Sequence, residues 1–218
     1  TQKGKVFWMR VYEIPEGGKN SKGRAMQNLI NIEQDDKVKA FLVTQDLKDE
    51  EYINNHYVIM ATKKGQVKKT SLEQYSRPRT NGINAITIRE GDELLEAKLT
   101  TGDSQVMLAL KSGKSIRFEE AKTRPMGRTA SGVRGITLQH ENDEVIGMVA
   151  VNDMESNILV VSEKGYGKRS KLEDYRITNR GGKGVKTLNI SEKTGNLVAI
   201  KNVDDSNDLM IINKSGLT

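Results

Sequence analysis

The chain has 218 residues, 35% of them hydrophobic and 5% aromatic, which is enough for one large domain or two small ones. It has no cysteine, and its two histidines, His56 and His140, share no ligand spacing, so disulfides and thiolate metal sites are excluded and a cytoplasmic protein is expected. No apolar run approaches the roughly 20 residues of a membrane-spanning helix, and the net charge of +6 is too modest to identify a partner alone.

Short apolar runs that end in a glycine turn recur along the chain. The turn glycines are Gly4, Gly65, Gly113, Gly165 and Gly216, spaced by 61, 48, 52 and 51 residues. A second glycine follows each of the first four after 17 to 19 residues and opens another apolar run; these are Gly23, Gly82, Gly132 and Gly184. Self-similarity at a fixed period of about 50 residues indicates a repeat architecture.

Each repeat predicts four short strands. In the second repeat they cover residues 57–62, 66–72, 83–88 and 93–99, which are rich in Val, Ile and Thr and bounded by turn residues. No segment shows a helical stripe of ten or more residues, so stacked helix pairs are excluded, and a plain β-sandwich would not explain the repeat. We therefore expect an all-β propeller of four-stranded blades, with about four blades and a partial end unit.

The repeat units are expected at residues 1–52, 53–103, 104–154 and 155–206, with a partial unit at 207–218. The first unit begins at its turn, with Thr1 where an initiator methionine would stand, and the last has only a leading strand. We therefore expect a piece of a longer protein with further units. A second possibility is that the end strand pairs where the first strand is missing and closes a four-unit ring.

Positive charge is concentrated in one equivalent part of every unit. The windows from turn glycine to second glycine, residues 4–23, 65–82, 113–132 and 165–184, hold 19 of the 35 Lys and Arg but 7 of the 29 Asp and Glu. Equivalent parts of a ring of repeats lie on one rim, so the windows predict a curved basic stripe. Such a stripe is the electrostatic footprint of a duplex bound through its phosphates.

The candidate DNA-binding residues are the cations of these windows other than Lys5. Lys68, Lys69, Arg117, Lys168 and Arg169 follow a turn glycine by three or four residues, which predicts one track along the rim. The full set is Arg10, Lys19, Lys22, Lys68, Lys69, Arg77, Arg79, Lys114, Arg117, Lys122, Arg124, Arg128, Lys168, Arg169, Lys171, Arg176, Arg180 and Lys183. No recognition helix is evident, so contacts to phosphates rather than to bases are expected.

The aromatic residues favour packing over base stacking. Tyr75 and Tyr175 recur at one position of their units and Tyr12 at a shifted one. Periodic tyrosines are more typical of blade packing than of a platform for single-stranded nucleic acid.

Three strings of the repeats resemble the C-terminal domain of DNA gyrase A: GQVKKT at 65–70, GVRGITL at 132–138 and GYGKRSKLEDY at 165–175. The resemblance covers essentially the whole chain. It implies a six-bladed β-pinwheel that wraps double-stranded DNA around its rim and supports ATP-dependent negative supercoiling. The implied partners are DNA, the rest of gyrase A, and gyrase B, in a nucleoid-associated cytoplasmic enzyme. Because that family's catalytic tyrosine, ATP site and Mg²⁺-binding acids lie in other domains, the resemblance implies no catalytic residue, metal or cofactor in this chain.

A glycine-rich basic loop at 179–184, NRGGKG, resembles the core of that family's box motif, Q-[KR]-R-G-G-K-G. Arg180, Gly181, Gly182, Lys183 and Gly184 match it, whereas Asn179 replaces a cation and Thr178 replaces the Gln. The family's box lies in the first blade, whereas this loop lies in the fourth visible unit. We expect Gly181 and Gly182 to allow close approach of a DNA phosphate and to leave their amides free to bind it, with Arg180 and Lys183 adding charge.

Three alternatives stay open at this point. The equivalent C-terminal domain of topoisomerase IV is a close rival, and a propeller that binds proteins would predict mixed-charge loops and exposed apolar patches. A nucleotide-binding enzyme is disfavoured, because GKS at 113–115 lacks the earlier P-loop glycine, whose place Leu108 takes.

Overall fold

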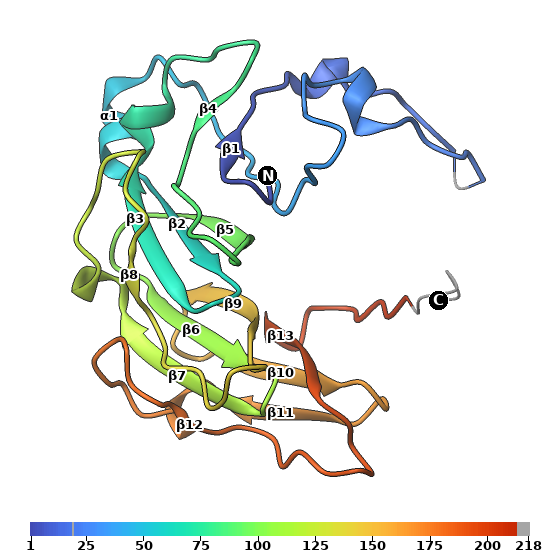
Figure 1. The fold of residues 1–218 in the computed structure, drawn as a ribbon, viewed down its shortest axis with the longest axis vertical. Coiled ribbons are helices and arrows are strands. Elements are labelled where there is room, and N and C mark those ends of the chain that lie inside the picture. The colour runs from blue at the N-terminus through green and yellow to red at the C-terminus, as the bar shows by residue number, and fades with distance from the viewer. Residues whose placement is uncertain (19, 213–218) are drawn as a thin grey trace.

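The computed structural model describes residues 1–18 and 20–212, and strands dominate it. Its sheets follow one another around an arc that is open on one side (Figure 1). A single short α-helix, α1 (Glu50–Asn55), and five 3-10 turns, η1 (Val11–Glu13), η2 (Met26–Asn28), η3 (Leu72–Tyr75), η4 (Glu120–Lys122) and η5 (Leu172–Asp174), join the strands of this part. No helix among the described residues is long and apolar enough to span a bilayer.

Two complete blades occupy the middle of the arc. One has the strand order β5 (Leu94–Thr100), β2 (Tyr57–Thr62), β3 (Gln66–Ser71) and β8 (Val133–Arg134). The other repeats this order with β9 (Val145–Val151), β6 (Gln105–Leu110), β7 (Lys114–Glu119) and β12 (Val185–Lys186). Every pairing within these blades is antiparallel.

The two flanking sheets are smaller in the described structure. A two-stranded sheet pairs β1 (Lys5–Val6) with β4 (Ile83–Asn84). A three-stranded sheet has the order β11 (Gly167–Lys171), β10 (Asn157–Ser162) and β13 (Leu197–Val203), so β11 lies at its edge.

In three of the four sheets the outer strand comes from the following repeat. β4 belongs to the second repeat but pairs with β1 of the first; β8 and β12 likewise pair with β3 and β7 of the preceding repeat. The prediction that the four strands of a repeat form one sheet is therefore wrong for the third strand. Strands β5, β9 and β13 lie on the inner side of the arc, and β8 and β12 on its outer side (Figure 1).

The hairpin glycines serve two repeats at once. Gly65 has φ +84°, a conformation that side chains rarely adopt, and a Cβ there would lie 2.8 Å from the carbonyl oxygen of Ile136 in the next repeat. The carbonyl group of Gly65 accepts hydrogen bonds from the amides of Gly135 and Ile136. A tight turn and the docking of the next repeat thus require glycine at one place.

The core lies between neighbouring blades. Ile59 and Val67 of one blade pack in a single cluster with Leu108 and Phe118 of the next and with Ile136, all at most 2% exposed. Because both faces of a sheet are covered, the four consecutive residues 67–70 of β3 are all buried. Strands of this kind lose the alternation of buried and exposed positions.

Candidate nucleic-acid interface

Three segments cover the outer edges of successive sheets, and we call them the edge segments: residues 76–84, 124–134 and 176–186. Backbone bonds hold them there: the amide of Met126 donates to Lys69 O at 2.8 Å and the amide of Thr178 to Arg117 O at 2.9 Å. Together they contain nine Lys or Arg and no Asp or Glu. The nine are Arg77, Arg79, Arg124, Arg128, Arg134, Arg176, Arg180, Lys183 and Lys186; Arg128 and Arg180 are half-buried and the others exposed.

The charge of the edge segments is not neutralised within the described part of the chain. No ion pair among residues 1–18 and 20–212 involves any of the nine cations. The edge segments therefore carry positive charge that no carboxylate of their own offsets, and such charge attracts a polyanion.

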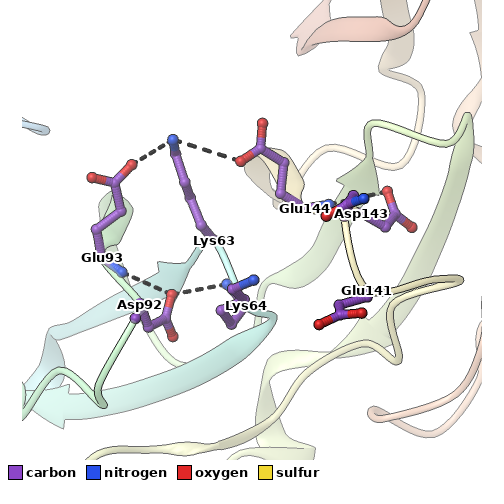
Figure 2. A pocket seen from close by; sticks show the side chains of 9 residues that line it. Lys63, Lys64, Asp92, Glu93, Glu141, Asp143 and Glu144 are labelled. Carbon is purple, nitrogen blue, oxygen red and sulfur yellow. Dashed lines mark hydrogen bonds and ion pairs between the residues drawn. The ribbon is translucent and has the colours of Figure 1, made fainter.

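Lysines at the hairpin turns, in contrast, are paired with the acidic turns that follow the outer strands. Lys63 lies 2.5 Å from a carboxylate oxygen of Glu93 and 3.6 Å from one of Glu144 (Figure 2). The ion pair with Glu93 is the main reason why the pKa of Lys63 is raised and that of Glu93 lowered. A pocket of about 380 Å³ between these turns is lined mostly by acidic and lysine side chains.

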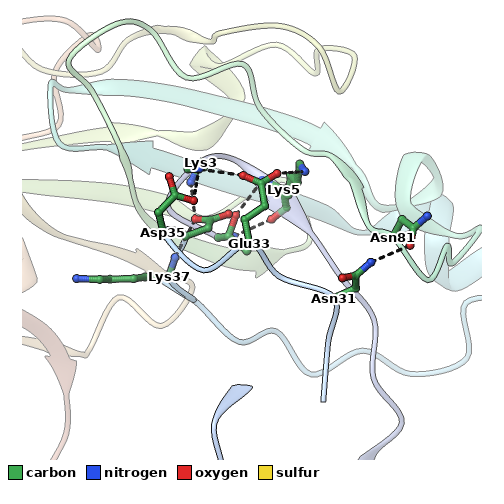
Figure 3. A network of polar contacts seen from close by, with 9 residues as sticks. Lys3, Lys5, Asn31, Glu33, Asp35, Lys37 and Asn81 are labelled. Atoms are coloured by element: carbon green, nitrogen blue, oxygen red, sulfur yellow. Dashed lines mark hydrogen bonds and ion pairs between the residues drawn. The ribbon is translucent and has the colours of Figure 1, made fainter. Parts of the chain in front are cut away.

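The first repeat has the same arrangement around Glu33. Lys5 and Lys3 donate to its two carboxylate oxygens at 2.7 and 2.9 Å, and Lys3 also reaches Asp35 (Figure 3). Hydrogen bonds from Lys5 and Lys3 lower the pKa of Glu33 to about 2. The hairpin lysines are thus matched by acids, whereas the edge segments are not.

Three of the predicted track residues are buried, so the expectation that they line a surface is wrong. Lys68, Lys69 and Arg117 are 0%, 4% and 8% exposed. They lie on β3 and β7, which the edge segments of the next repeat cover. Their positive groups bond protein atoms instead of facing solvent.

Lys68 donates from its Nζ to the carbonyl oxygens of Ala85 at 2.6 Å and Arg128 at 2.7 Å. Burial lowers the pKa of Lys68 to about 8, because the charged form loses its hydration. The ammonium group thus ties the edge segment at Arg128 to the sheet below it.

Lys69 and Arg117 occupy equivalent positions and reach into the next repeat. Lys69 lies 3.1 Å from a carboxylate oxygen of the fully buried Glu120 and over the ring of Tyr57. Arg117 donates from Nη1 to the carbonyl oxygens of Leu172 at 2.7 Å and Tyr175 at 2.9 Å. Both side chains therefore join neighbouring repeats.

Lys168 and Arg169 occupy the equivalent positions on β11 and are exposed. In the described structure no strand covers the outer edge of β11, and Arg169 pairs with the exposed Asp205 at 2.7 Å. The same two strand positions are thus buried in the second and third repeats and exposed in the fourth, which is why the five residues do not form one track.

The remaining predicted residues are placed as follows. Lys114 is half-buried and donates to Gln139 at 2.6 Å, and Lys122 and Lys171 lie near the carboxylates of Glu119 and Glu173. Arg10, Lys22, Lys122 and Lys171 are exposed but lie outside the edge segments. Lys19 lies outside the described residues. The predicted packing of Tyr75 and Tyr175 is confirmed, since each is 4% exposed, whereas Tyr12 is 84% exposed.

The loop 179–184 is docked on the outer strand of the third repeat. The Gly181 amide donates to Gly135 O at 2.6 Å, and Thr137 donates from its amide to Gly182 O at 2.9 Å and from its hydroxyl to Gly181 O at 2.7 Å. The expectation that the Gly181 amide is free for a phosphate is therefore wrong. Gly182 and Lys183 are exposed.

Arg134 and Lys186 are exposed cations of the edge segments that the sequence prediction missed. The charge windows ended at the second glycine of each unit, and both residues follow it by two positions. Extending the windows through the next strand would have included them.

Blades that exchange their outer strands around an arc define an all-β protein of the propeller class. The family model of the DNA gyrase C-terminal domain, described as a β-propeller, matches residues 1–45, 56–101, 106–152 and 156–204. The chain belongs to this family, and the predicted family resemblance and propeller fold are confirmed.

Relatives and solved structures agree with this assignment. The chain is 43% identical over all 218 residues to the DNA gyrase A proteins of Staphylococcus epidermidis and of Staphylococcus aureus, and it spans 24% of their length. It is similar to a solved C-terminal domain of DNA topoisomerase IV (TM-score 0.81, 25% identity, 94% of this chain and 62% of that one). It also shares its fold with a DNA gyrase A C-terminal domain (TM-score 0.76, 24% identity, 94% and 64% coverage).

Proposed function

We propose that the chain binds duplex DNA along its outer edge and bends it there, as the DNA-wrapping part of a bacterial type II topoisomerase. The observation that supports this most directly is the set of edge segments, with nine cations, no acid and no internal ion pair among the described residues. Phosphates carry one charge per about 1.7 Å of duplex axis, so a row of such segments offers regular neutralisation along a curved path.

The larger assembly belongs to the same proposal. Because the 43%-identical relatives are gyrase A proteins, the chain would work with the remainder of gyrase A and with gyrase B in a nucleoid-associated enzyme that introduces negative supercoils. Chemistry on the DNA, with ATP and Mg²⁺, would take place in other domains. The similarity to a topoisomerase IV domain is one of fold, and the identity to gyrase relatives favours gyrase.

The contacts would be to phosphates and independent of base sequence. The exposed charged side chains of the edge segments are Arg and Lys on strands and loops, and no helix of the described structure lies within these segments. Binding should therefore fall steeply with salt and vary little between random sequences.

A mobility-shift titration of this chain with duplexes of unrelated sequence, across a salt series, tests the proposal. We expect the logarithm of the binding constant to fall linearly with the logarithm of salt concentration, with a slope of about −0.9 for each phosphate contacted. A flat salt response, or one duplex bound far more tightly than the rest, would refute it.

A further inference from the structure

The basic loop 179–184 is positioned by the repeat before it. Thr137 bonds two successive carbonyl groups of the loop, and Gln139 donates from its side-chain amide to Lys183 O at 3.0 Å. The oxygen of the Gln139 amide in turn accepts from Lys114 at 2.6 Å. The main chain on both sides of the Lys183 side chain is therefore fixed by the third repeat.

Arg180 also holds the loop rather than extending into solvent. Its Nε donates to Lys122 O at 3.0 Å and its Nη1 to Arg134 O at 3.1 Å. An arginine has five N–H donors in a rigid planar fork, and here at least two of them are used on main-chain oxygens. Lys183, in contrast, is exposed, and no hydrogen bond or ion pair among the described residues uses its ammonium group.

The same device occurs at the preceding junction. Thr87 occupies in the second repeat the place of Thr137 in the third, five residues after the second glycine. It donates from its amide to Ala130 O at 3.2 Å and from its hydroxyl to Thr129 O at 2.7 Å, next to the cation Arg128. A threonine that bonds two successive carbonyls of the next repeat's basic loop is thus a repeated feature.

We propose that Thr137 and Arg180 are positioning residues that hold the loop 179–184 so that Lys183, rather than Arg180, meets a DNA phosphate. This inference rests on the proposed DNA binding. It assigns different roles to the two cations of the loop, one structural and one in contact with the ligand. By the same geometry Thr87 positions the loop that contains Arg128.

The test is a substitution between two uncharged residues, measured by its effect on the salt slope of duplex binding. Thr137→Val keeps the shape of the side chain and removes no charge, so a purely structural role would leave the number of phosphate contacts unchanged. If the hydroxyl places Lys183 on a phosphate, Thr137→Val weakens duplex binding about fivefold. It also makes the salt slope shallower by up to about 0.9, as does Lys183→Ala.

Coupling between the two positions completes the test. Adding Thr137→Val to Lys183→Ala should weaken binding by less than about twofold, because the first acts through the second. Thr87→Val is the matched control at the other junction, and its fold-loss of affinity should multiply with that of Lys183→Ala. If the fold-losses of Thr137→Val and Lys183→Ala also multiply in full, or if Thr137→Val leaves the salt slope unchanged, the positioning role is overturned.

Arg180→Lys provides an independent variant that keeps the charge. We expect it to reduce affinity and salt slope like Thr137→Val, because an ammonium group does not reproduce the two-carbonyl fork. If Arg180→Lys binds duplex DNA as tightly as wild type, Arg180 acts only through its charge and the inference is refuted. Thermal melts followed by circular dichroism check that each variant is folded. If the wild-type chain itself shows no salt-dependent binding, the proposed function is refuted. If the wild-type chain has a steep salt slope and the variants bind like it, only the positioning role is refuted.

Discussion

Lys69 and Glu120 form a buried ion pair between the second and third repeats. The carboxylate also accepts from the hydroxyl of Thr100 at 2.7 Å, and Lys69 donates to Gly102 O at 3.2 Å. The second and fourth repeats have Leu72 and Leu172 where the third has Glu120, so among these three repeats only the third has a carboxylate at this position. A buried ion pair adds little net stability over an apolar pair of similar volume, whereas one partner left alone is costly.

Removing one partner of the ion pair should lower the stability of the fold, whereas replacing both partners should not. Lys69→Met leaves the Glu120 carboxylate buried and unpaired, so we expect the free energy of unfolding to fall by about 3 kcal/mol. Lys69→Met combined with Glu120→Leu, the residue of the sister repeats, should recover most of that loss in urea denaturation. A double variant no more stable than Lys69→Met would contradict this account.

Lys68 makes stability depend on pH in the alkaline range. Its pKa is lowered from 10.5 to about 8 by burial. Below about pH 8 the ammonium is charged in both states; above it the folded state loses the proton first, so the unfolded state binds more protons and stability rises with pH. The slope should approach about 1.4 kcal/mol per pH unit.

The pH range in which the effect of Lys68 on stability can be measured ends near pH 10. Burial raises the pKa of Tyr75 to about 12, so above its ordinary value of 10 the unfolded state ionises first and stability falls. Denaturation of wild type and of Lys68→Ile, which copies Ile116 of the next repeat, measures the difference. We expect the Lys68 contribution to vanish in the variant, and an equal pH dependence of both proteins between about pH 8 and 10 would disprove it.

At the scale of the element, the loop 179–184 contains a glycine that the fold requires and one that it tolerates. Gly184 has φ +72°, and a Cβ there would lie 2.5 Å from Ser115 O. Gly182 has ordinary space, with its nearest side-chain atom, from Ile116, at 3.5 Å. Gly184→Ala should therefore destabilise by about 2 kcal/mol or more, through positive φ and the clash. Gly182→Ala, in the same loop, should melt within a few degrees of wild type in a calorimetric scan.

The elements that sequence predicted well are those set by local chemistry. Turn glycines and β-branched runs located the hairpins, because positive φ and pleated packing depend on a few adjacent residues. The short helix α1 was missed, although Asp49 caps it by accepting from the Tyr52 amide at 3.1 Å. Six residues are too few for a helical stripe to appear.

Strand exchange and the burial of Lys68 could not be predicted in this way. Which sheet receives residues 83–88 depends on contacts with another repeat, and no local pattern encodes them. Lys68 looked like a surface cation because lysine usually is one, and its burial follows from the edge segment that covers β3. The charge windows found most cations of the outer edge but not which of them face solvent.

For the whole molecule, the edge segments should act together and more strongly than net charge alone. Lys183→Glu with Lys186→Glu changes the charge by the same amount as Lys37→Glu with Lys48→Glu. All four lysines are exposed, and the second pair lies outside the edge segments. Loss of two phosphate contacts should make the salt slope of duplex binding shallower by about 1.8 in the first variant only. If both double variants reduce the salt slope equally, the edge segments contribute no more to DNA binding than other surface lysines.

The exchanged outer strands also determine how the molecule resists force. Curving roughly 20–30 base pairs of duplex stores on the order of 1–6 kcal/mol of elastic energy. A bent duplex therefore pulls outward on the protein surface that holds it. Each edge segment belongs by chain to one blade and by hydrogen bonds to the blade before it, as Val133 of β8 pairs with Val67 of β3. An outward pull on one segment is therefore shared by two blades. If DNA bends on the edge segments as we propose, its recoil would be distributed along the arc rather than concentrated on one repeat.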